Sequence, residues 1–475
     1  MHGPAPAPRP GPPGPLPAVL SDAVRQLKRG TVLVVGDAML DRYVYGRVER
    51  VSREAPVPVL SVEREVALPG GAGNVVRNLT ALGAAVAFVS VVGDDQAGSD
   101  LTGLIGGQPG VEPWLLVQGG RATTTKTRFV ATGQQLLRAD HEQTAAIHQR
   151  LADRLVRIAG DAVAATAVMV LSDYRKGVLA GDTPTRLIAA ARTAGRRVLV
   201  DPKGGDHARY AGADLIMPDI EELAEATGLP TATEAEIAAA AAALRRTHGF
   251  GAVMVQRGEQ GVTLIEGEAE GETVQHMPSD VAELVDPSGA GDAVVAVAAA
   301  GLAAGLPMPV IARLGALAAG IVLGKTGITV VREDEFLEVL TPGRLATRKL
   351  VTRSEAAERV ERWRRAGCRV GFLVCRGAEG AAELVTGARS WCDRLVVALG
   401  DADPAAAALA ELPGADLIAR FGAETPLELI RLLRPDVLVQ APGSNAFSQP
   451  GGEVVQEWGG TVRNATPEVA APTAA

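Results

Sequence analysis

Residues 167–203 read AVMVLSDYRKGVLAGDTPTRLIAAARTAGRRVLVDPK, and this stretch decides the fold. It begins and ends with short apolar runs, AVMVLSD (167–173) and RVLVDPK (197–203), which have the length and composition of buried strands. Between them lies a segment with the 3.6-residue periodicity of a helix. The runs DLIMPD (214–219) and AVMVQRG (252–258) continue the alternation. Strands that alternate with helices predict an α/β fold, with a mostly parallel sheet covered by helices on both faces.

The same pattern extends in both directions along the chain. Two apolar runs, TVLVVGD (31–37) and AVAFVSVVGDD (85–95), add strands. Residues 43–64 suggest small β elements that form a lid, and residues 123–140 suggest hairpin strands. Apolar helices over 289–326 close this domain, and a second unit of strands and helices begins near residue 350. We therefore expect a disordered Pro-rich tail (1–20), an α/β domain (21–338), a linker (339–350), a second α/β domain (351–465) and a disordered tail (466–475).

The composition limits the class of protein. Of the 475 residues 47% are hydrophobic but only 3% are aromatic, so we expect aliphatic, alanine-rich cores. A net charge of −8 argues against nucleic acid as the main partner. The uncharged run 293–312 is only weakly hydrophobic and contains Pro307 and Pro309, so we interpret it as buried helices and not as a membrane span. We expect a cytoplasmic protein whose ligands are small molecules.

The segment DPSGAGD (286–292) points to phosphate chemistry. Its small residues Gly289, Ala290 and Gly291 let a ligand approach the backbone closely, and a helix start offers unpaired N–H groups and the positive end of a dipole. The carboxylate of Asp292 follows at once and can accept a proton from a hydroxyl held beside the anion. These features suit transfer of a phosphoryl group to a hydroxyl. The alternative is an acid that only interacts with the helix dipole.

Two earlier loops carry groups that can hold hydroxyls. GDAMLD (36–41) supplies two carboxylates, and PGGAGN (69–74) supplies a pair of glycines and an amide. Taken one at a time, these are ordinary turn residues. Together they can bind several hydroxyls, which indicates a sugar. The residues concerned are Asp37, Asp41, Gly70, Gly71 and Asn74.

These three motifs together resemble those of the ribokinase-like (PfkB) carbohydrate kinases. Further segments, SREAPVPVL (52–60), LSDYRKGVL (171–179) and LGKTG (323–327) among them, resemble the heptose 7-phosphate kinase domain of the bifunctional heptose kinase/adenylyltransferases. The resemblance covers roughly residues 25–335. It implies a ribokinase-like domain followed by a Rossmann-like domain of the nucleotidyltransferase type. The implied activity is ATP-dependent phosphorylation of D-glycero-D-manno-heptose 7-phosphate at C1, with Mg²⁺, and we expect a homodimer.

The resemblance also assigns roles to residues by position. Asp292 would be the general base, and Gly289, Ala290 and Gly291 would form the anion hole. The family's Asn-x-x-Glu motif for nucleotide and magnesium falls on residues 219–222, where Asp219 replaces the asparagine and Glu222 would hold Mg²⁺ through water. The other candidates for binding ATP are Ile220, Glu221, Arg257 and Gly258. The candidates for binding the sugar are Asp37, Asp41, Gly70, Gly71, Asn74, Arg138 and Lys203.

Several cations are candidates for holding the distal phosphate of the sugar or the phosphates of ATP, and each is equally compatible with a solvated surface charge. They are Lys126, Arg128, Arg138, Lys176 and Lys203. Two alternative functions remain open: a PfkB kinase for another sugar or sugar phosphate, and a non-catalytic sugar-phosphate sensor. The intact Asp292 and the glycine turn before it count against the sensor.

The second domain departs from the nucleotidyltransferases that it resembles. Those enzymes carry an Asn-Gly-x-Phe-Asp strand end and a His-x-Gly-His helix start. Here VCRGAEGAAELV (374–385) stands in that region, and the last histidine of the chain is His276. We therefore expect a folded second domain without adenylyltransferase activity, and a separate adenylyltransferase that completes the pathway.

Overall fold

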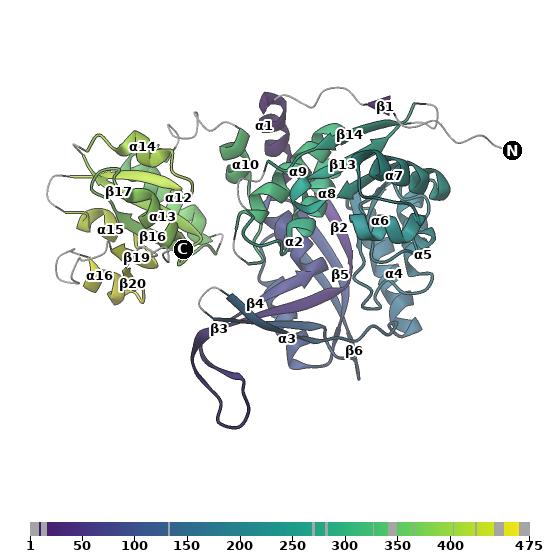
Figure 1. The fold of residues 1–475 in the computed structure, drawn as a ribbon, viewed down its shortest axis with the longest axis horizontal. Helices are drawn as coiled ribbons and strands as arrows, with labels where there is room; N and C mark the ends of the chain where they lie inside the picture. Colours follow the sequence, from purple (N-terminus) through teal and green to yellow (C-terminus); the bar gives the residue numbers. More distant parts are fainter. Residues whose placement is uncertain are drawn as a thin grey trace, which may run out of the picture. The chain divides into compact units, whose positions relative to one another are not determined.

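The computed structural model describes residues 9–10, 17–131, 134–267, 271–280, 284–325, 327–340, 349–365, 367–401, 403–422, 425–440 and 451–464. The chain forms two compact units, Met1–Phe336 and Leu337–Ala475, which are described separately (Figure 1). The division lies close to residue 338, the predicted end of the first α/β domain. Within the described residues, no helix combines the length and the apolar character needed to span a bilayer.

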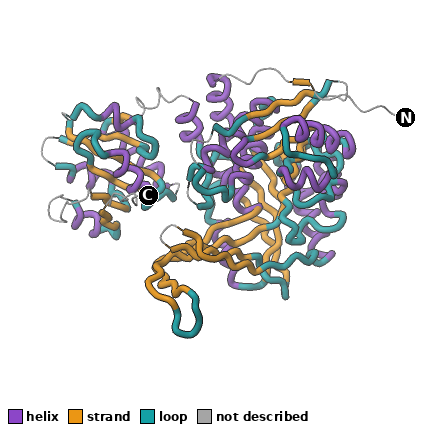
Figure 2. The backbone as a smooth tube through the Cα atoms, viewed as in Figure 1, coloured by secondary structure: helices purple, strands orange, loops and turns teal. Residues whose placement is uncertain are grey.

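A ten-stranded sheet forms the centre of the first unit (Figure 2). Its order is β1-β14-β13-β12-β11-β10-β9-β2-β5-β6, and its pairs are parallel except for those that β13 makes with β12 and β14. The aliphatic runs seen in the sequence form its middle, where every residue of β9 is buried, as expected for a sheet covered on both faces. The strands are β1 (Arg9–Pro10), β2 (Thr31–Gly36), β5 (Ala85–Gly93), β6 (Val111–Gln118), β9 (Val168–Ser172), β10 (Arg197–Asp201), β11 (Leu215–Ile216), β12 (Ala252–Gln256), β13 (Val262–Glu266) and β14 (Thr273–Met277).

Helices cover both faces of this sheet. On one face α4 (Gln149–Val163), α5 (Thr183–Thr193), α6 (Ile220–Thr227) and α7 (Glu234–His248) share an aliphatic core with alternate strand residues (Figure 1). On the other face α2 (Ala72–Ala81), α8 (Ala290–Ala303) and α9 (Met308–Leu323) pack together and against the strands. The small side chains of α8 allow this close packing, and most of its residues are fully buried. The predicted α/β fold is confirmed.

A separate four-stranded sheet joins the predicted lid, residues 43–64, with the predicted hairpin strands of residues 123–140, and the whole sheet is called the lid below. Its order is β4-β3-β7-β8, and the long β3–β4 hairpin projects from the rest of the unit (Figure 2). Strand β3 pairs with β4 in antiparallel fashion and with β7 in parallel. Because β3 begins two residues after β2 ends, the lid is joined directly to the carboxyl edge of the main sheet. The lid strands are β3 (Ala38–Val51), β4 (Pro58–Gly71), β7 (Thr125–Ala131) and β8 (Gln134–His141).

The second unit is a parallel α/β sheet of six strands in the order β15-β18-β17-β16-β19-β20. One face packs against α13 and α14, and the other against α12, α15 and α16, so the sheet has two aliphatic cores. Its strands are β15 (Leu350–Val351), β16 (Val370–Val374), β17 (Arg394–Gly400), β18 (Leu417–Phe421), β19 (Val437–Gln440) and β20 (Thr461–Asn464). Its helices are α12 (Arg353–Arg365), α13 (Ala381–Arg389), α14 (Ala406–Ala410), α15 (Leu427–Leu433) and α16 (Gly452–Glu457). This order of strands and helices is consistent with the Rossmann-like domain that was predicted.

The predicted tail and linker need correction. Helix α1 (Pro17–Gln26) begins inside the predicted tail, because Leu20, Ala23 and Val24 give it an apolar side that the first unit buries. Helix α10 (Glu333–Leu340) and strand β15 occupy the two ends of the predicted linker, whose residues 341–348 lie outside the described residues. The predicted tail 466–475, and residue 465 before it, also lie outside them.

Candidate active site

The candidate site lies at the carboxyl edge of the main sheet. In parallel α/β sheets, ligands bind beside the carboxyl ends of the strands. Strands β10, β9 and β2 are neighbours, so the residues that follow them meet at one place. Asp201 ends β10, Tyr174 follows β9, and Asp37 follows β2. The start of α8 reaches the same place, because Asp292 contacts Tyr174.

The turn before α8 is held in a form that exposes backbone N–H groups. Gly289 has φ +80°, a left-handed conformation that favours glycine, and a side chain there would come within 2.9 Å of the Asn74 amide. Asp286 fixes the turn: its Oδ1 accepts from the Ser288 N–H (2.9 Å) and its Oδ2 from the Gly327 N–H (3.0 Å). The turn therefore fixes the backbone at the start of α8, where the anion hole was predicted.

Asp292 lies in the first turn of α8 between two donors. The Asn74 side chain donates to Oδ2 (2.6 Å), and the Tyr174 hydroxyl donates to Oδ1. Removal from bulk water raises the pKa of Asp292 to about 6, although both hydrogen bonds oppose the rise. A carboxylate with this pKa is ionised at neutral pH and is matched to accept a proton there.

Asp41 lies on β3, at the base of the lid, and is almost completely buried. Its Oδ1 accepts from Arg128 of β7 at 2.5 Å. Its Oδ2 lies against Gly70, where a Cβ would come within 1.8 Å of that oxygen. The neighbouring Gly71 and Asn74 open helix α2, so the two predicted sugar loops do meet.

The structure corrects the prediction for Asp37. Its side chain is 1% exposed and accepts three backbone N–H groups: Tyr174 (2.9 Å) and Lys176 (3.0 Å) at Oδ2, and Val178 (3.0 Å) at Oδ1. Burial raises its pKa to about 6 despite these bonds. Asp37 therefore anchors the loop after β9 and presents no free oxygen to a sugar.

Asp219 and Glu222 form a capping box at the start of α6. The Asp219 side chain accepts from the Glu222 N–H (2.8 Å), and the Glu222 side chain accepts from the Asp219 N–H (2.9 Å). Lys203, which was predicted to bind the sugar, instead contacts Glu222 (2.5 Å) and Asp219 (3.4 Å). Burial raises the pKa of Glu222, although Lys203 opposes the rise. Ile220 and Glu221 follow in the same helix turn.

The other predicted ATP residues lie just after β12. Arg257 is buried and pairs with Glu234 of α7 (2.8 Å), so its guanidinium is engaged within the protein. Gly258 has φ +60° and begins a short 3-10 helix. Strand β12 reaches the nucleotide motif, because Gln256 and Asp219 form an isolated β-bridge.

The candidate cations of the lid differ in their surroundings. Lys126 of β7 and Lys176 of the loop after β9 both contact Glu142, each at 2.7 Å, and they hold its pKa at about 2. Arg138 of β8 is exposed and pairs with Asp140 (3.0 Å). The paired lysines form a small basic group beside the lid, whereas Arg138 lies among the exposed residues of β8.

Two residues of the site were missed by the sequence analysis. Tyr174 contacts Asp292. Burial raises the pKa of Asp201 well above its usual range, and the charges of Asp292 and Glu222 raise it further. Tyr174 directly follows the run 167–173, and Asp201 lies near the end of the run 197–203, both of which were predicted as strands. The rule that ligands bind at carboxyl ends of strands was therefore the signal that would have found them.

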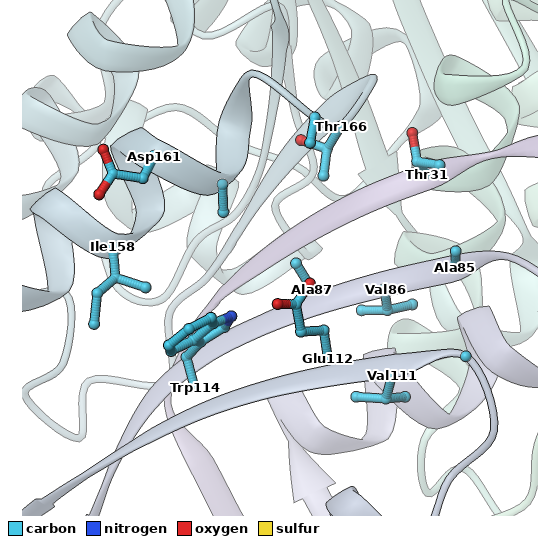
Figure 3. Close-up of a pocket in the computed structure, with 13 residues that line it drawn as sticks. Thr31, Ala85, Val86, Ala87, Val111, Glu112, Trp114, Ile158, Asp161 and Thr166 are labelled. Atoms are coloured by element: carbon cyan, nitrogen blue, oxygen red, sulfur yellow. The ribbon is translucent and has the colours of Figure 1, made fainter.

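A cavity of about 680 Å³ lies elsewhere in the first unit (Figure 3). Thr31, Ala85 and Val111, the first residues of β2, β5 and β6, line it together with Trp114 and with Ile158 of α4. It is therefore at the amino ends of these strands, and no predicted site residue lines it. The residues that suit phosphate chemistry lie at the opposite edge of the sheet.

Comparisons with known proteins show the family of this chain. The model of the pfkB family of carbohydrate kinases matches residues 29–334. A bifunctional protein HldE from Acidiphilium cryptum is 54% identical over 459 residues, which cover 93% of this chain and 94% of that protein. The protein of the same name from Paramagnetospirillum magneticum is 45% identical and covers 94% of this chain and 95% of that protein.

Solved structures share the fold at low sequence identity. Arabidopsis thaliana ribokinase, complexed with ribose and ATP, has a TM-score of 0.52 and 22% identity, covering 66% of this chain and 99% of that one. Phosphofructokinase-2 from Escherichia coli has a TM-score of 0.55 and 19% identity, with the same coverage. The first unit therefore has the ribokinase-like fold. The chain belongs to the pfkB family of carbohydrate kinases and is a phosphotransferase that acts on a sugar.

Proposed function

We propose that this kinase transfers the γ-phosphate of ATP to the C1 hydroxyl of D-glycero-D-manno-heptose 7-phosphate. The observation that carries the proposal is the position of Asp292 at the start of α8, between Asn74 and Tyr174 and directly after the glycine turn. A base and an anion hole within one helix turn serve a reaction in which a hydroxyl attacks a phosphate. ATP as donor follows from membership of the kinase family.

In the proposed reaction Asp292 accepts the proton of the C1 hydroxyl, and the C1 oxygen of the sugar attacks the γ-phosphorus of ATP. The bond from that phosphorus to the bridging oxygen breaks, and ADP leaves. The N–H groups of Gly289, Ala290 and Gly291 stabilise the charge of the phosphoryl group as it moves. Asp41 and Asn74 bind sugar hydroxyls, and Gly70 and Gly71 let the sugar approach the backbone.

Magnesium is proposed as a partner of the ATP phosphates. Among the described residues, no three or more His, Cys, Asp or Glu side chains are grouped to hold a metal directly. Mg²⁺ keeps several of its waters in kinase sites, so a carboxylate such as Glu222 fits a role through water. Bound there, Mg²⁺ neutralises charge on the phosphates, while Asp219 and the start of α6 orient the nucleotide.

The distal phosphate of the substrate is proposed to bind the basic group of Lys126 and Lys176. In the structure these lysines share the carboxylate of Glu142 (2.7 Å each). A phosphate offers more acceptor oxygens and more charge than one carboxylate. This group favours a phosphorylated sugar over a free one. The alternatives remain a kinase for another sugar phosphate and a sensor that binds without transfer.

The second unit is proposed to lack adenylyltransferase activity, although related chains are named bifunctional. Charge on the α-phosphate must be stabilised as pyrophosphate leaves, and no histidine follows His276 to supply the usual imidazole donors. In addition, the carboxylate of Asp403 lies against the segment 374–385 that stands in place of the histidine motif: its Oδ2 accepts from the Gly377 N–H (2.8 Å). Backbone hydrogen bonds lower the pKa of Asp403, and its negative charge disfavours a phosphate beside this segment. A separate adenylyltransferase then completes the pathway.

A homodimer is proposed to form through the lid. Apolar side chains are exposed on the β3–β4 hairpin and on β8, where water would otherwise surround them. They are Val48, Val51, Val57, Val62, Leu136 and Leu137. Sedimentation at micromolar concentration is expected to give twice the 48.9 kDa mass of the chain, and a monomer at that concentration excludes this interface.

The experiment that tests the function is a substrate screen. The full chain is incubated with ATP, Mg²⁺ and matched heptose, hexose and pentose phosphates, and with the unphosphorylated heptose, and ADP release is followed. The position of the new phosphate is assigned by NMR. The proposal expects heptose 7-phosphate to give the highest kcat/KM and a phosphate on C1. A higher kcat/KM for another sugar identifies the first alternative, and binding without ADP release identifies the sensor.

A further inference from the structure

The loop that follows β9, residues 173–178, is held unusually firmly for a surface connection. Asp37 accepts the backbone N–H groups of Tyr174, Lys176 and Val178 (2.9–3.0 Å). One buried carboxylate therefore fixes the backbone at Tyr174 and at two residues after it. All three bonds go to backbone groups of the loop, so they act on its position.

A second carboxylate holds the same loop from the other side. Asp173 Oδ1 accepts from the Arg175 N–H (2.7 Å), and its Oδ2 accepts from the buried Tyr210 hydroxyl (2.6 Å). Arg175 has φ 55°, a left-handed conformation that non-glycine residues adopt only when their surroundings require it. The loop is thus constrained to one conformation, and in that conformation the Tyr174 hydroxyl meets Asp292.

We propose that Tyr174 is a positioning residue for phosphoryl transfer: its hydroxyl orients the carboxylate of Asp292 and favours the ionised form, and Asp37 holds Tyr174 in place. This inference rests on the proposed role of Asp292 as the general base. A phenol that donates to a carboxylate stabilises its charge, and a carboxylate held by two donors has a defined direction toward the hydroxyl that it deprotonates.

Other groups around Asp292 define what Tyr174 adds. From α2, Asn74 donates to the second oxygen, and the Arg77 guanidinium favours the ionised form. Asp41 from β3 opposes it, and Asp201 at the end of β10 faces it as a further carboxyl. Tyr174 is the donor to Oδ1. Without its hydroxyl, burial and the charge of Asp41 raise the pKa of Asp292 further.

The test is the pH profile of kcat/KM for the sugar in Tyr174→Phe, which removes the hydroxyl and keeps the ring. Loss of one charge-assisted hydrogen bond is expected to shift the acidic limb of the profile to higher pH by about one unit. Activity then falls about fivefold at pH 6 and is nearly restored at pH 8, as follows from the titration of one group. Thr166→Val is the control, because it also removes a buried hydroxyl but lies at the opposite edge of the sheet, where it lines the cavity of Figure 3.

Asp37→Asn tests the anchor. It is expected to move the acidic limb in the same direction. Addition of Tyr174→Phe is expected to move the limb no further, because both changes break the same connection, from Asp37 through Tyr174 to Asp292. Thermal unfolding of each variant shows whether it is folded at the assay temperature. The inference is overturned if Tyr174→Phe leaves the acidic limb in place, or if Thr166→Val moves it equally. The base itself is tested by Asp292→Asn: activity in that variant overturns the proposed role of Asp292, whereas an inactive Asp292→Asn beside an unmoved Tyr174→Phe overturns only this inference.

Discussion

The pKa of Asp292 decides how the enzyme responds to acid. Burial raises the pKa of Asp292 to about 6, so its carboxyl is protonated and unable to accept a proton below that pH. We expect kcat/KM for the sugar to fall about tenfold per pH unit below 6 and to be level above about pH 7. Initial rates from pH 4.5 to 8.5 in a constant-ionic-strength buffer measure this. A profile that stays level down to pH 5 contradicts the assignment.

Gly70 is the residue at which the sugar loop tolerates no side chain. In Gly70→Ala the new Cβ would lie 1.8 Å from Asp41 Oδ2, so that carboxylate must move. We expect the KM for the sugar to rise at least about tenfold, as displacement of one charged hydrogen-bonding group implies, with little change in the KM for ATP. Gly103→Ala on α3 (Gln96–Gly106) is the matched control, since no atom lies within 4 Å of the added carbon. Equal effects of the two changes on sugar KM would refute this account.

At the scale of residues, the sequence predicted the motifs that form the site more successfully than it predicted the role of each residue in them. The small residues before Asp292 and the pair of loops at 36–41 and 69–74 were visible as patterns, and the structure brings them together. The role of Asp37 was not predictable, because its three partners lie more than 130 positions away and are backbone groups. Lys203 was equally ambiguous, since a lysine after a strand can face either the sugar or the nucleotide.

Among the elements, the lid depends on a contact between β3 and β7. Arg128 and Asp41 form an ion pair at 2.5 Å whose side chains are 12% and 5% exposed. Arg128→Ala leaves a buried carboxylate without its cation, so we expect a loss of up to about 3 kcal/mol of stability and a higher KM for the sugar. Arg128→Lys should recover part of both, because it restores charge without the fork geometry.

Arg47→Ala provides the control for that element. Arg47 lies on the same strand β3 and pairs with Glu63, but both side chains are exposed, so its loss is expected to change stability by less than about 1 kcal/mol. Urea unfolding and sugar KM are measured for the three variants. If Arg47→Ala and Arg128→Ala behave alike, the buried pair does not join the lid to the sugar site.

Elements with strong patterns were predictable and irregular ones were not. The buried runs at 167–173 and 197–203 correspond to β9 and β10, because a strand covered on both faces is apolar throughout. Strand β6 was missed: it forms the edge of the sheet, contains Pro113 and exposes Trp114 and Val117, so it shows no clear period. The antiparallel strands β13 and β14 were missed as well, because they contain the polar residues Thr263 and Gln275, which are buried in the folded unit.

At the scale of the whole molecule, two folded units are expected to carry one catalytic activity. The second unit retains a parallel sheet with two aliphatic cores but has no histidine to stabilise pyrophosphate as it leaves. We expect the full chain, incubated with ATP and heptose 1-phosphate, to release no pyrophosphate above background. The same preparation must phosphorylate heptose 7-phosphate, which shows that it is active. Formation of ADP-heptose at an enzymatic rate disproves the loss.

The central claim is that Asp292 removes the proton from the sugar hydroxyl that attacks ATP. Its most direct measurement is kcat of Asp292→Asn with heptose 7-phosphate, ATP and Mg²⁺ at pH 7.5, beside the ATP dissociation constant of the same variant. The amide keeps the shape of the carboxylate and can accept a hydrogen bond from Tyr174 or Asn74, but it cannot accept the proton. The account predicts a fall in kcat of at least ~10²-fold, the scale of general-base catalysis, with ATP binding unchanged. A variant that turns over at near the normal rate would contradict it.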